Sequence, residues 1–122
     1  MAAEWEISSG ELEQKIAEGY QLIDIRDAQN VAYGMIPGAI NMAQENLPDY
    51  AGELSHKKGA VIYCTRCRFS KDAVETLREL GVQAYSLRGG YMGWLMDQME
   101  KEKHGISVFF LLLQKRSGHM SL

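Results

Sequence analysis

Apolar residues follow two different periods along this chain, and together they predict strands that alternate with helices. Ala60–Tyr63 is an apolar run without polar alternation, typical of a strand buried on both faces in a parallel sheet. From Ser70 to Leu80 the apolar positions recur at helical spacing, and Gly81 follows as a stop signal. The pattern predicts an α/β fold in which helices flank both faces of a mainly parallel sheet.

Shorter signals place the remaining elements. Ser8 and Glu11 form the capping-box pattern that begins a helix, and Gly19 is its expected end. Further strands are expected over residues 4–7, 21–26, 40–43 and 82–87. Short helical segments are expected over residues 27–34 and 46–54, and a final helix over 91–103.

The two later helices are each expected to carry one apolar face. In the helix after Ser70, these inward residues are Ala73, Val74, Leu77 and Leu80. In the final helix, they are Met92, Leu95, Met96 and Met99. We therefore expect one domain over residues 4–103 and a tail of uncertain structure over 104–122.

The tail contains the longest apolar run of the chain, from Ile106 to Leu113. A membrane-spanning helix needs about 20 apolar residues, so this run is too short to cross a bilayer. It is also too apolar to remain in water without cover. Three outcomes stay open: it packs on its own domain, it forms a homodimer with a second copy, or it contacts another partner.

Composition narrows the class of protein. The chain has 13 basic and 16 acidic residues and a net charge of −3, which does not suit a nucleic-acid surface. Its 2 cysteines are close together rather than spread as in a disulfide scaffold. The first nine residues lack the basic and apolar stretches of a secretory signal. These features predict a cytoplasmic protein, and its scattered histidines make a poor zinc set, so we expect neither metal nor cofactor.

The candidate chemistry lies in the loop after the buried strand, where Cys64 is followed by a helix that begins near Ser70. In open α/β sheets, ligands bind beyond the carboxyl ends of the strands. A helix N-terminus offers free N–H groups and partial positive charge, which favour the nucleophilic thiolate. Arg66, Arg68 and Lys71 add positive charge. Cys64 is therefore the candidate nucleophile, although a cysteine at a strand end is also often a small buried apolar residue.

Three segments in this order resemble the rhodanese-like family. The first is Leu22–Asp27 followed by Gly34–Asn41, which is similar to a strand ending in Asp-Val-Arg and a Gly-His-Ile-Pro-Gly-Ala loop. The second is Tyr63–Ser70, similar to the active-site loop, and the third is Leu87–Trp94, similar to a Gly-Gly turn before a helix with tryptophan. The loop departs from the family's Cys-Arg-x-Gly-x-Arg-Ser at Thr65, Cys67 and Phe69.

The resemblance implies a sulfurtransferase. Cys64 would take sulfur from thiosulfate or a protein persulfide, become a persulfide, and pass the sulfur to a thiol or to cyanide. The loop amides and nearby cations would bind the anionic sulfur. The residues implied for this binding are Thr65, Arg66, Cys67, Arg68, Phe69 and Ser70.

Three charged residues outside the loop are candidates for supporting the predicted Cys64 site. Arg88 should lie near the Cys64 loop if the sheet is parallel, and there it would bind an anionic donor. Asp24 and Arg26, at the carboxyl end of their strand, either shape the site or form a structural ion pair.

Other functions remain open from the sequence. Cys64 and Cys67 could act as a dithiol redox switch, and the chain could be a non-catalytic binding module that kept the fold. A thioredoxin-like protein would carry a proline downstream of its cysteines, and here both prolines lie upstream. A phosphatase or arsenate reductase of this fold would have arginine where Ser70 stands, so both are less favoured.

Overall fold

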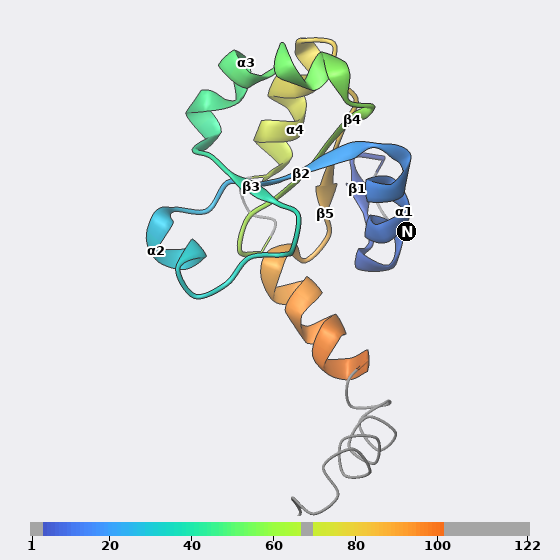
Figure 1. Ribbon diagram of the computed structural model, residues 1–122, viewed down its shortest axis with the longest axis vertical. Coiled ribbons are helices and arrows are strands. Elements are labelled where there is room, and N and C mark those ends of the chain that lie inside the picture. The colour runs from blue at the N-terminus through green and yellow to red at the C-terminus, as the bar shows by residue number, and fades with distance from the viewer. Residues whose placement is uncertain (1–3, 67–69, 102–122) are drawn as a thin grey trace, which may run out of the picture.

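The computed structural model describes residues 4–66 and 70–101 (Figure 1). Its sheet has 5 strands in the order β1-β5-β4-β2-β3, and every adjacent pair is parallel. The strands are β1 Glu6–Ile7, β2 Tyr20–Asp24, β3 Ile40–Asn41, β4 Gly59–Tyr63 and β5 Ala84–Leu87. The parallel sheet predicted from the apolar run in β4 is confirmed, and all 5 residues of that strand are buried.

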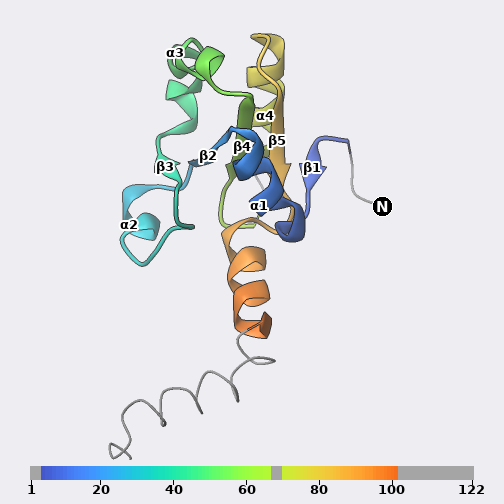
Figure 2. The same ribbon diagram turned by 45° about the vertical axis from the view of Figure 1, so that its right-hand side comes forward.

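Helices cover both faces of this sheet, as predicted (Figures 1 and 2). The helical segments are α1 Ser9–Glu18, α2 Ala28–Val31, η1 Gln44–Asn46, α3 Leu47–Tyr50, η2 Glu53–His56 and α4 Ser70–Glu79. A last helix covers residues 90–101, up to the end of the described chain. The single helix expected over 46–54 is instead two short segments, with Pro48 in the first turn of α3 and η2 following Gly52.

The start of α1 shows how local sequence sets an element. The Ser8 N–H donates to Oε1 of Glu11 at 2.8 Å, and the Glu11 N–H donates to Oγ of Ser8 at 3.2 Å, so the predicted capping box is confirmed. The Ser8 hydroxyl also donates to Oε1 of Glu11, at 3.0 Å, and the two bonds from the Ser8 N–H and hydroxyl lower the pKa of Glu11 because they favour its charged form. The helix ends at Gly19, also as predicted.

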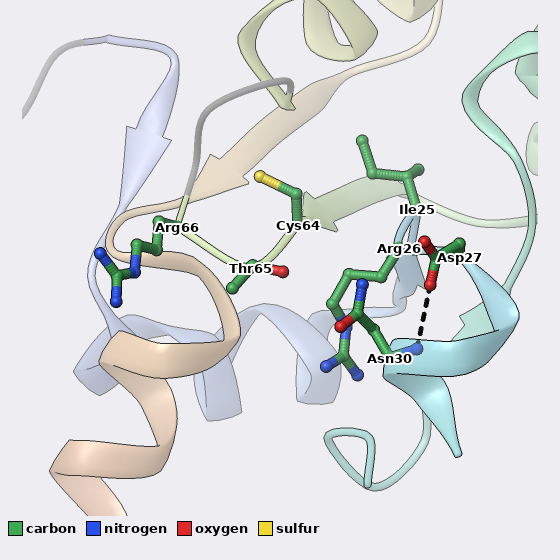
Figure 3. Close-up of a pocket in the computed structure, with 7 residues that line it drawn as sticks. All are labelled: Ile25, Arg26, Asp27, Asn30, Cys64, Thr65 and Arg66. Carbon is green, nitrogen blue, oxygen red and sulfur yellow. Dashed lines mark hydrogen bonds between the residues drawn. The ribbon is translucent and has the colours of Figure 1, made fainter. Parts of the chain in front are cut away.

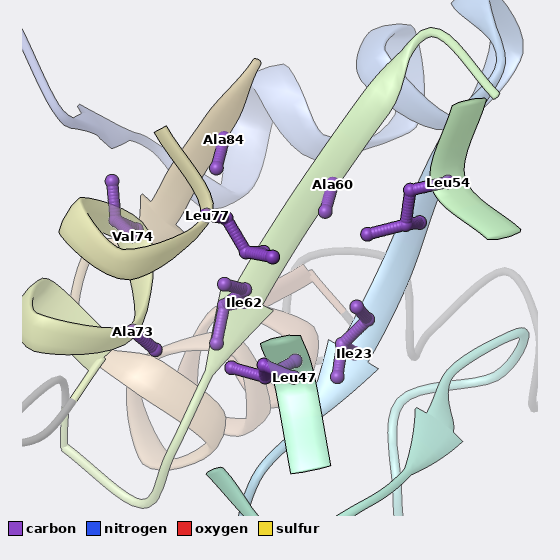
Figure 4. Close-up of a cluster of buried hydrophobic side chains, with 9 residues drawn as sticks. All are labelled: Ile23, Leu47, Leu54, Ala60, Ile62, Ala73, Val74, Leu77 and Ala84. Carbon is purple, nitrogen blue, oxygen red and sulfur yellow. The ribbon is translucent and has the colours of Figure 1, made fainter. Parts of the chain in front are cut away.

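Two apolar clusters pack against opposite faces of the sheet. Figure 4 shows the first, in which α3, η2 and α4 cover one face: Ile23, Leu47, Leu54, Ala60, Ile62, Ala73, Val74, Leu77 and Ala84. The second joins α1 to the other face: Ile7, Leu12, Tyr20, Leu22, Ile36, Val61, Tyr63 and Leu87. Consecutive residues of β4 alternate between the two clusters, as strand geometry requires.

Three predicted core residues are exposed instead. Leu80, one residue beyond α4, is 51% exposed, and Met96 and Met99 in the last helix are 64% and 61% exposed. The last helix contacts the domain as far as Asp97, whose carboxylate accepts a hydrogen bond from the Ser9 hydroxyl, and its end projects away from the domain (Figures 1 and 2). Helical spacing correctly identified an apolar face, but the described domain does not extend far enough to cover it.

One negative finding concerns membranes. Within residues 4–66 and 70–101, no helix is both long and apolar enough to cross a bilayer.

Candidate active site

Cys64 follows β4 directly, at the carboxyl edge of the sheet. It is 5% exposed, and β4 is hydrogen-bonded to β2 on one side and β5 on the other. The site residue is thus anchored to a central strand that is itself fully buried. This is the edge at which open parallel sheets bind their ligands.

The backbone after β4 is held by the last helix. The Tyr91 N–H donates to the Cys64 carbonyl at 2.8 Å, and the Met92 N–H donates to the Thr65 carbonyl at 3.0 Å. The first N–H groups of a helix have no partner within the helix, so these two bonds satisfy both sides. The Gly89-Gly90 turn brings the helix into this position, with φ of 82° and 63° at the two glycines.

The sulfur of Cys64 faces a buried hydroxyl. Its Sγ lies 4.0 Å from Oγ of Ser70, the first residue of α4, and Ser70 is fully buried. The Ser70 hydroxyl in turn shares a 2.6 Å hydrogen bond with that of Ser86 in β5. The sulfur therefore has a hydroxyl within weak hydrogen-bonding reach on the side of α4.

A pocket of about 490 Å³ opens beside Cys64 (Figure 3). The residues that line it come from the ends of β2 and β4 and from α2: Ile25, Arg26, Asp27, Asn30, Cys64, Thr65 and Arg66. In Figure 3, Cys64 lies between Arg66 on one side and Arg26, Asp27 and Asn30 on the other, and the Arg66 side chain is turned away from the cysteine. The wall combines cationic, anionic and neutral amide groups, so it is suited to a small polar ligand.

Arg26 is held in place by Asp24. Both side chains are buried, and the Arg26 guanidinium donates to both carboxylate oxygens, with the shortest contact 2.7 Å between Nη2 and Oδ2. Nη2 also donates to the Gly34 carbonyl at 2.6 Å. Burial alone would lower the pKa of Arg26, but the hydrogen bonds and charge of Asp24 raise it, so the guanidinium stays charged. The ion pair that the sequence offered as one alternative is therefore present.

Arg26 also makes cation–π contacts with two aromatic rings. Its guanidinium carbon lies 4.1 Å from the ring centre of Tyr91 and 5.7 Å from that of Tyr63. The Tyr63 hydroxyl accepts a 3.1 Å hydrogen bond from the Ile36 N–H. Burial raises the pKa of Tyr63 well above its ordinary value, because the phenolate would lose its hydration. Arg26 thus links the pocket to the start of the last helix.

The structure brings together only part of the predicted site. Arg26, Cys64, Thr65 and Arg66 line the pocket, whereas Asp24 lies behind it as the partner of Arg26. Ser70 is buried against the Cys64 sulfur. The predicted contacts of Cys67, Arg68 and Phe69 lie outside the described residues.

Arg88 follows β5 and is exposed. It is not one of the described residues that line this pocket. Its charge instead contributes to the low pKa of Glu11, after the larger effect of the Ser8 hydrogen bonds, so it lies toward α1. Its role in binding a donor stays a prediction.

Three residues of the pocket were not predicted as site residues: Ile25, Asp27 and Asn30. Asp27 is the N-cap of α2 and accepts a 3.0 Å hydrogen bond from the Asn30 N–H (Figure 3). The sequence did indicate a turn and short helix here. Nothing in the local pattern shows that β2 and β4 lie side by side, and that pairing is what places α2 against Cys64.

The described residues contain no cluster of three or more histidine, cysteine or acidic side chains that could hold a metal ion. Cys64 is the cysteine among the residues that line the pocket.

A family model matches most of this chain. The model is that of the Rhodanese-like domain, over residues 8–97, and the chain belongs to this family. The thiosulfate sulfurtransferase GlpE of Shewanella oneidensis is 35% identical over 79 residues, which are 64% of this chain and 78% of that protein. The putative sulfurtransferase YtwF of Bacillus subtilis is 34% identical over 91 residues, 73% of this chain and 88% of that protein.

Solved structures agree with the fold. A rhodanese-related protein from Thermoplasma volcanium superposes with a TM-score of 0.67 at 26% identity, covering 75% of this chain and 91% of that one. The human single-domain sulfurtransferase TSTD1 gives a TM-score of 0.61 at 25% identity, covering 77% of this chain and 97% of that one. The resemblance stated from the sequence is thus confirmed at the level of family and fold.

Proposed function

We propose that this protein is a sulfurtransferase and that Cys64 carries the sulfur as a persulfide. The observation that carries the proposal is the position of Cys64. It follows the buried strand β4 and lines a pocket whose wall also contains Arg26 and Arg66. The sulfurtransferase relatives support the class of reaction. A nucleophilic cysteine beside a small polar pocket is suited to covalent transfer of a small group.

The first half-reaction takes sulfur from the donor. The Cys64 thiolate attacks the outer sulfur of thiosulfate, a new S–S bond forms, and the S–S bond of thiosulfate breaks. Sulfite leaves with the electron pair of that bond, and the Cys64 persulfide carries the remaining negative charge. A protein persulfide can serve as donor in the same way, with a thiolate as the leaving group.

The second half-reaction returns the thiolate. A thiolate or cyanide acceptor attacks the outer sulfur of the persulfide, and the S–S bond to Cys64 breaks. The products are a new persulfide or thiocyanate, and the Cys64 thiolate receives the bonding electron pair. No redox cofactor is consumed, because each step exchanges one sulfur bond for another.

We propose separate roles for the surrounding residues. Backbone N–H groups of residues 65–70, together with Arg66, Arg68 and Arg88, stabilise the anionic sulfur and the departing anion. Asp24 positions Arg26, since the guanidinium donates to both oxygens of its carboxylate. Arg26 then presents a fixed positive charge at the wall of the pocket.

Thiosulfate-to-cyanide transfer by the full chain tests the function. Wild type should produce thiocyanate, and both Cys64→Ser and Cys64→Ala should lose the activity while circular dichroism and thermal unfolding remain close to wild type. Activity of either variant within a few-fold of wild type would contradict the assignment. Wild type that is inactive with thiosulfate and with a persulfide donor would instead favour a non-catalytic binding module.

We also propose that the protein works in the cytoplasm as a homodimer. A reduced cytoplasm keeps cysteine available as a thiol. Met96 and Met99 are exposed on the last helix, three residues apart, and so lie on one helix face. The apolar run Ile106–Leu113 follows shortly in the sequence. A second copy of the chain would supply the matching apolar surface for both.

A further inference from the structure

Ser86 reaches the Cys64 sulfur through one intermediate hydroxyl. We propose that Ser86 is a positioning residue: it donates a hydrogen bond to the Ser70 oxygen and thereby strengthens the hydrogen bond that Ser70 donates to the Cys64 thiolate. This inference rests on the proposed function only in taking Cys64 as the reactive sulfur. Neither the sequence pattern nor the pocket lining singles out Ser86.

The parallel register of β4 and β5 brings these residues together. Ser86 is the register partner of Ile62, two residues before Cys64, and partners in a parallel pair direct their side chains to the same face of the sheet. That face is covered by α4, of which Ser70 is the first residue. Ser70 and Ser86 are both fully buried, and their hydroxyl oxygens are 2.6 Å apart.

The number of protons on the two hydroxyls decides which serine donates in the hydrogen bond between Ser70 and Ser86. Each serine hydroxyl has one proton to donate, although its oxygen can accept further bonds. When Cys64 is a thiol, its S–H can donate to Ser70 across the 4.0 Å contact, and Ser70 can donate to Ser86. When Cys64 is a thiolate it can only accept, so in a hydrogen bond across this contact Ser70 is the donor. The 2.6 Å bond then requires Ser86 to be the donor.

The thiolate form is therefore favoured by Ser86, a donor that is separated from the sulfur by Ser70. A hydrogen bond to an ionised group is stronger than one between neutral groups, and a chain of such bonds strengthens each member. Removing the Ser86 hydroxyl takes away the donor that polarises the Ser70 hydroxyl, so the hydrogen bond from Ser70 to the thiolate weakens. The thiolate becomes less favoured, while the position of Cys64 directly after β4 is unchanged.

The pH dependence of Cys64 alkylation measures this directly. The full-length protein is treated with iodoacetamide across a pH series, and modification is followed by mass on the tryptic peptide 59–66, which contains Cys64 but not Cys67. The variants are Ser86→Ala, Ser70→Ala and the double variant. Ser55→Ala, the same change at an exposed serine in η2, is the matched control.

Ser86→Ala should raise the pH midpoint of alkylation by about half a unit to one unit, and slow the reaction at pH 7 by about three- to tenfold. Ser70→Ala should do at least as much, and adding Ser86→Ala to it should change little. A Ser86→Ala profile that matches wild type overturns the proposal. So does a Ser86→Ala effect that remains in full when Ser70 is already alanine, since Ser86 would then act by another route.

A second pair of variants covers the case in which Ser86→Ala does not fold. Ser86→Thr and Ser86→Val have the same shape and differ by one hydroxyl, so the threonine variant should alkylate at the lower pH midpoint. Equal midpoints in these two variants overturn the proposal. If Ser86→Ala shifts the midpoint of alkylation but the wild type forms no persulfide, the role of Ser86 is supported and only the proposed sulfur transfer is contradicted.

Discussion

Gly90 and Cys64 are in backbone contact: a β-carbon on residue 90 would lie 2.5 Å from the carbonyl oxygen of Cys64. Gly90 also has a φ of 63°, a conformation that favours glycine. The last helix can therefore donate its first N–H groups to the Cys64 loop only if residue 90 has no side chain. This contact joins the candidate nucleophile to an element that projects beyond the domain (Figure 1).

The first prediction follows from that contact. Gly90→Ala should lower the free energy of unfolding by about 2 to 5 kcal/mol, from backbone strain together with the steric contact. Gly38→Ala is the matched control, because Gly38 has a φ of 88° but nothing within 4 Å of its β-carbon position. It should cost only the strain, about 1 to 2 kcal/mol. Denaturant unfolding measures both, and equal losses would show that the Cys64 contact is unimportant.

The second prediction concerns the buried pair of Asp24 and Arg26. Arg26→Gln should destabilise the fold by about 3 to 5 kcal/mol, because it leaves the Asp24 carboxylate buried without its cation. Adding Asp24→Asn removes that charge. The double variant should therefore lose less free energy of unfolding than the sum of the losses in the two single variants. The same unfolding measurement decides the point, and strictly additive losses would argue against the pair as a unit.

The third prediction is a pH dependence at Tyr63. Its pKa is raised from 10.0 by burial, so above pH 10 the unfolded chain loses a proton that the folded chain keeps. The unfolded state then binds fewer protons, and stability falls as pH rises. Below pH 10 both states are protonated, and this contribution to stability is present in full.

Tyr63→Phe should remove this component. At neutral pH it should cost about 1 kcal/mol, through loss of the hydrogen bond from Ile36 to the hydroxyl. Between pH 10 and 12 its stability should decline less steeply than that of wild type. Urea unfolding at several pH values gives the slopes, and Tyr33→Phe, at a residue that is 92% exposed, is the control. Parallel slopes for wild type and Tyr63→Phe would refute the prediction.

Local sequence predicted those parts of the fold in which the deciding contacts are also local. The Ser8–Glu11 capping box and the Gly19 end of α1 involve groups a few residues apart, and the apolar run of β4 reflects burial on both faces. The position of Cys64 after β4 was predicted for the same reason. The resemblance to a family supplied the Asp24–Arg26 segment, whose ion pair spans only two residues.

Contacts between distant segments could not be predicted in this way. Ser86 meets Ser70 only because β5 pairs with β4 in one register, and Asn30 lines the pocket only because β2 lies on the other side of β4. Met96 and Met99 were wrongly expected in the core, since helical spacing identifies an apolar face but not what covers it. Arg88 follows its strand as expected, yet it is exposed and lies toward α1.

The fourth prediction tests the proposed dimer. Deleting residues 106–122, or replacing both exposed methionines by Met96→Gln and Met99→Gln, should shift the mass in solution from dimer toward monomer, because each change removes apolar contact area. Leu80→Gln, at an exposed leucine beyond α4, should leave the mass unchanged. Size-exclusion chromatography with light scattering gives the mass. A monomer for wild type and variants alike would reject the dimer.

The most direct test of sulfur transfer is the intact mass of the protein after incubation with thiosulfate. If Cys64 forms a persulfide, reduced wild type should gain the mass of one sulfur atom, and treatment with a thiol reductant should remove it. Cys64→Ser should gain nothing under the same conditions. Wild type that takes up no sulfur from thiosulfate or from a persulfide donor, or a Cys64→Ser variant that takes up as much as wild type, would contradict the assignment of Cys64 as sulfur carrier.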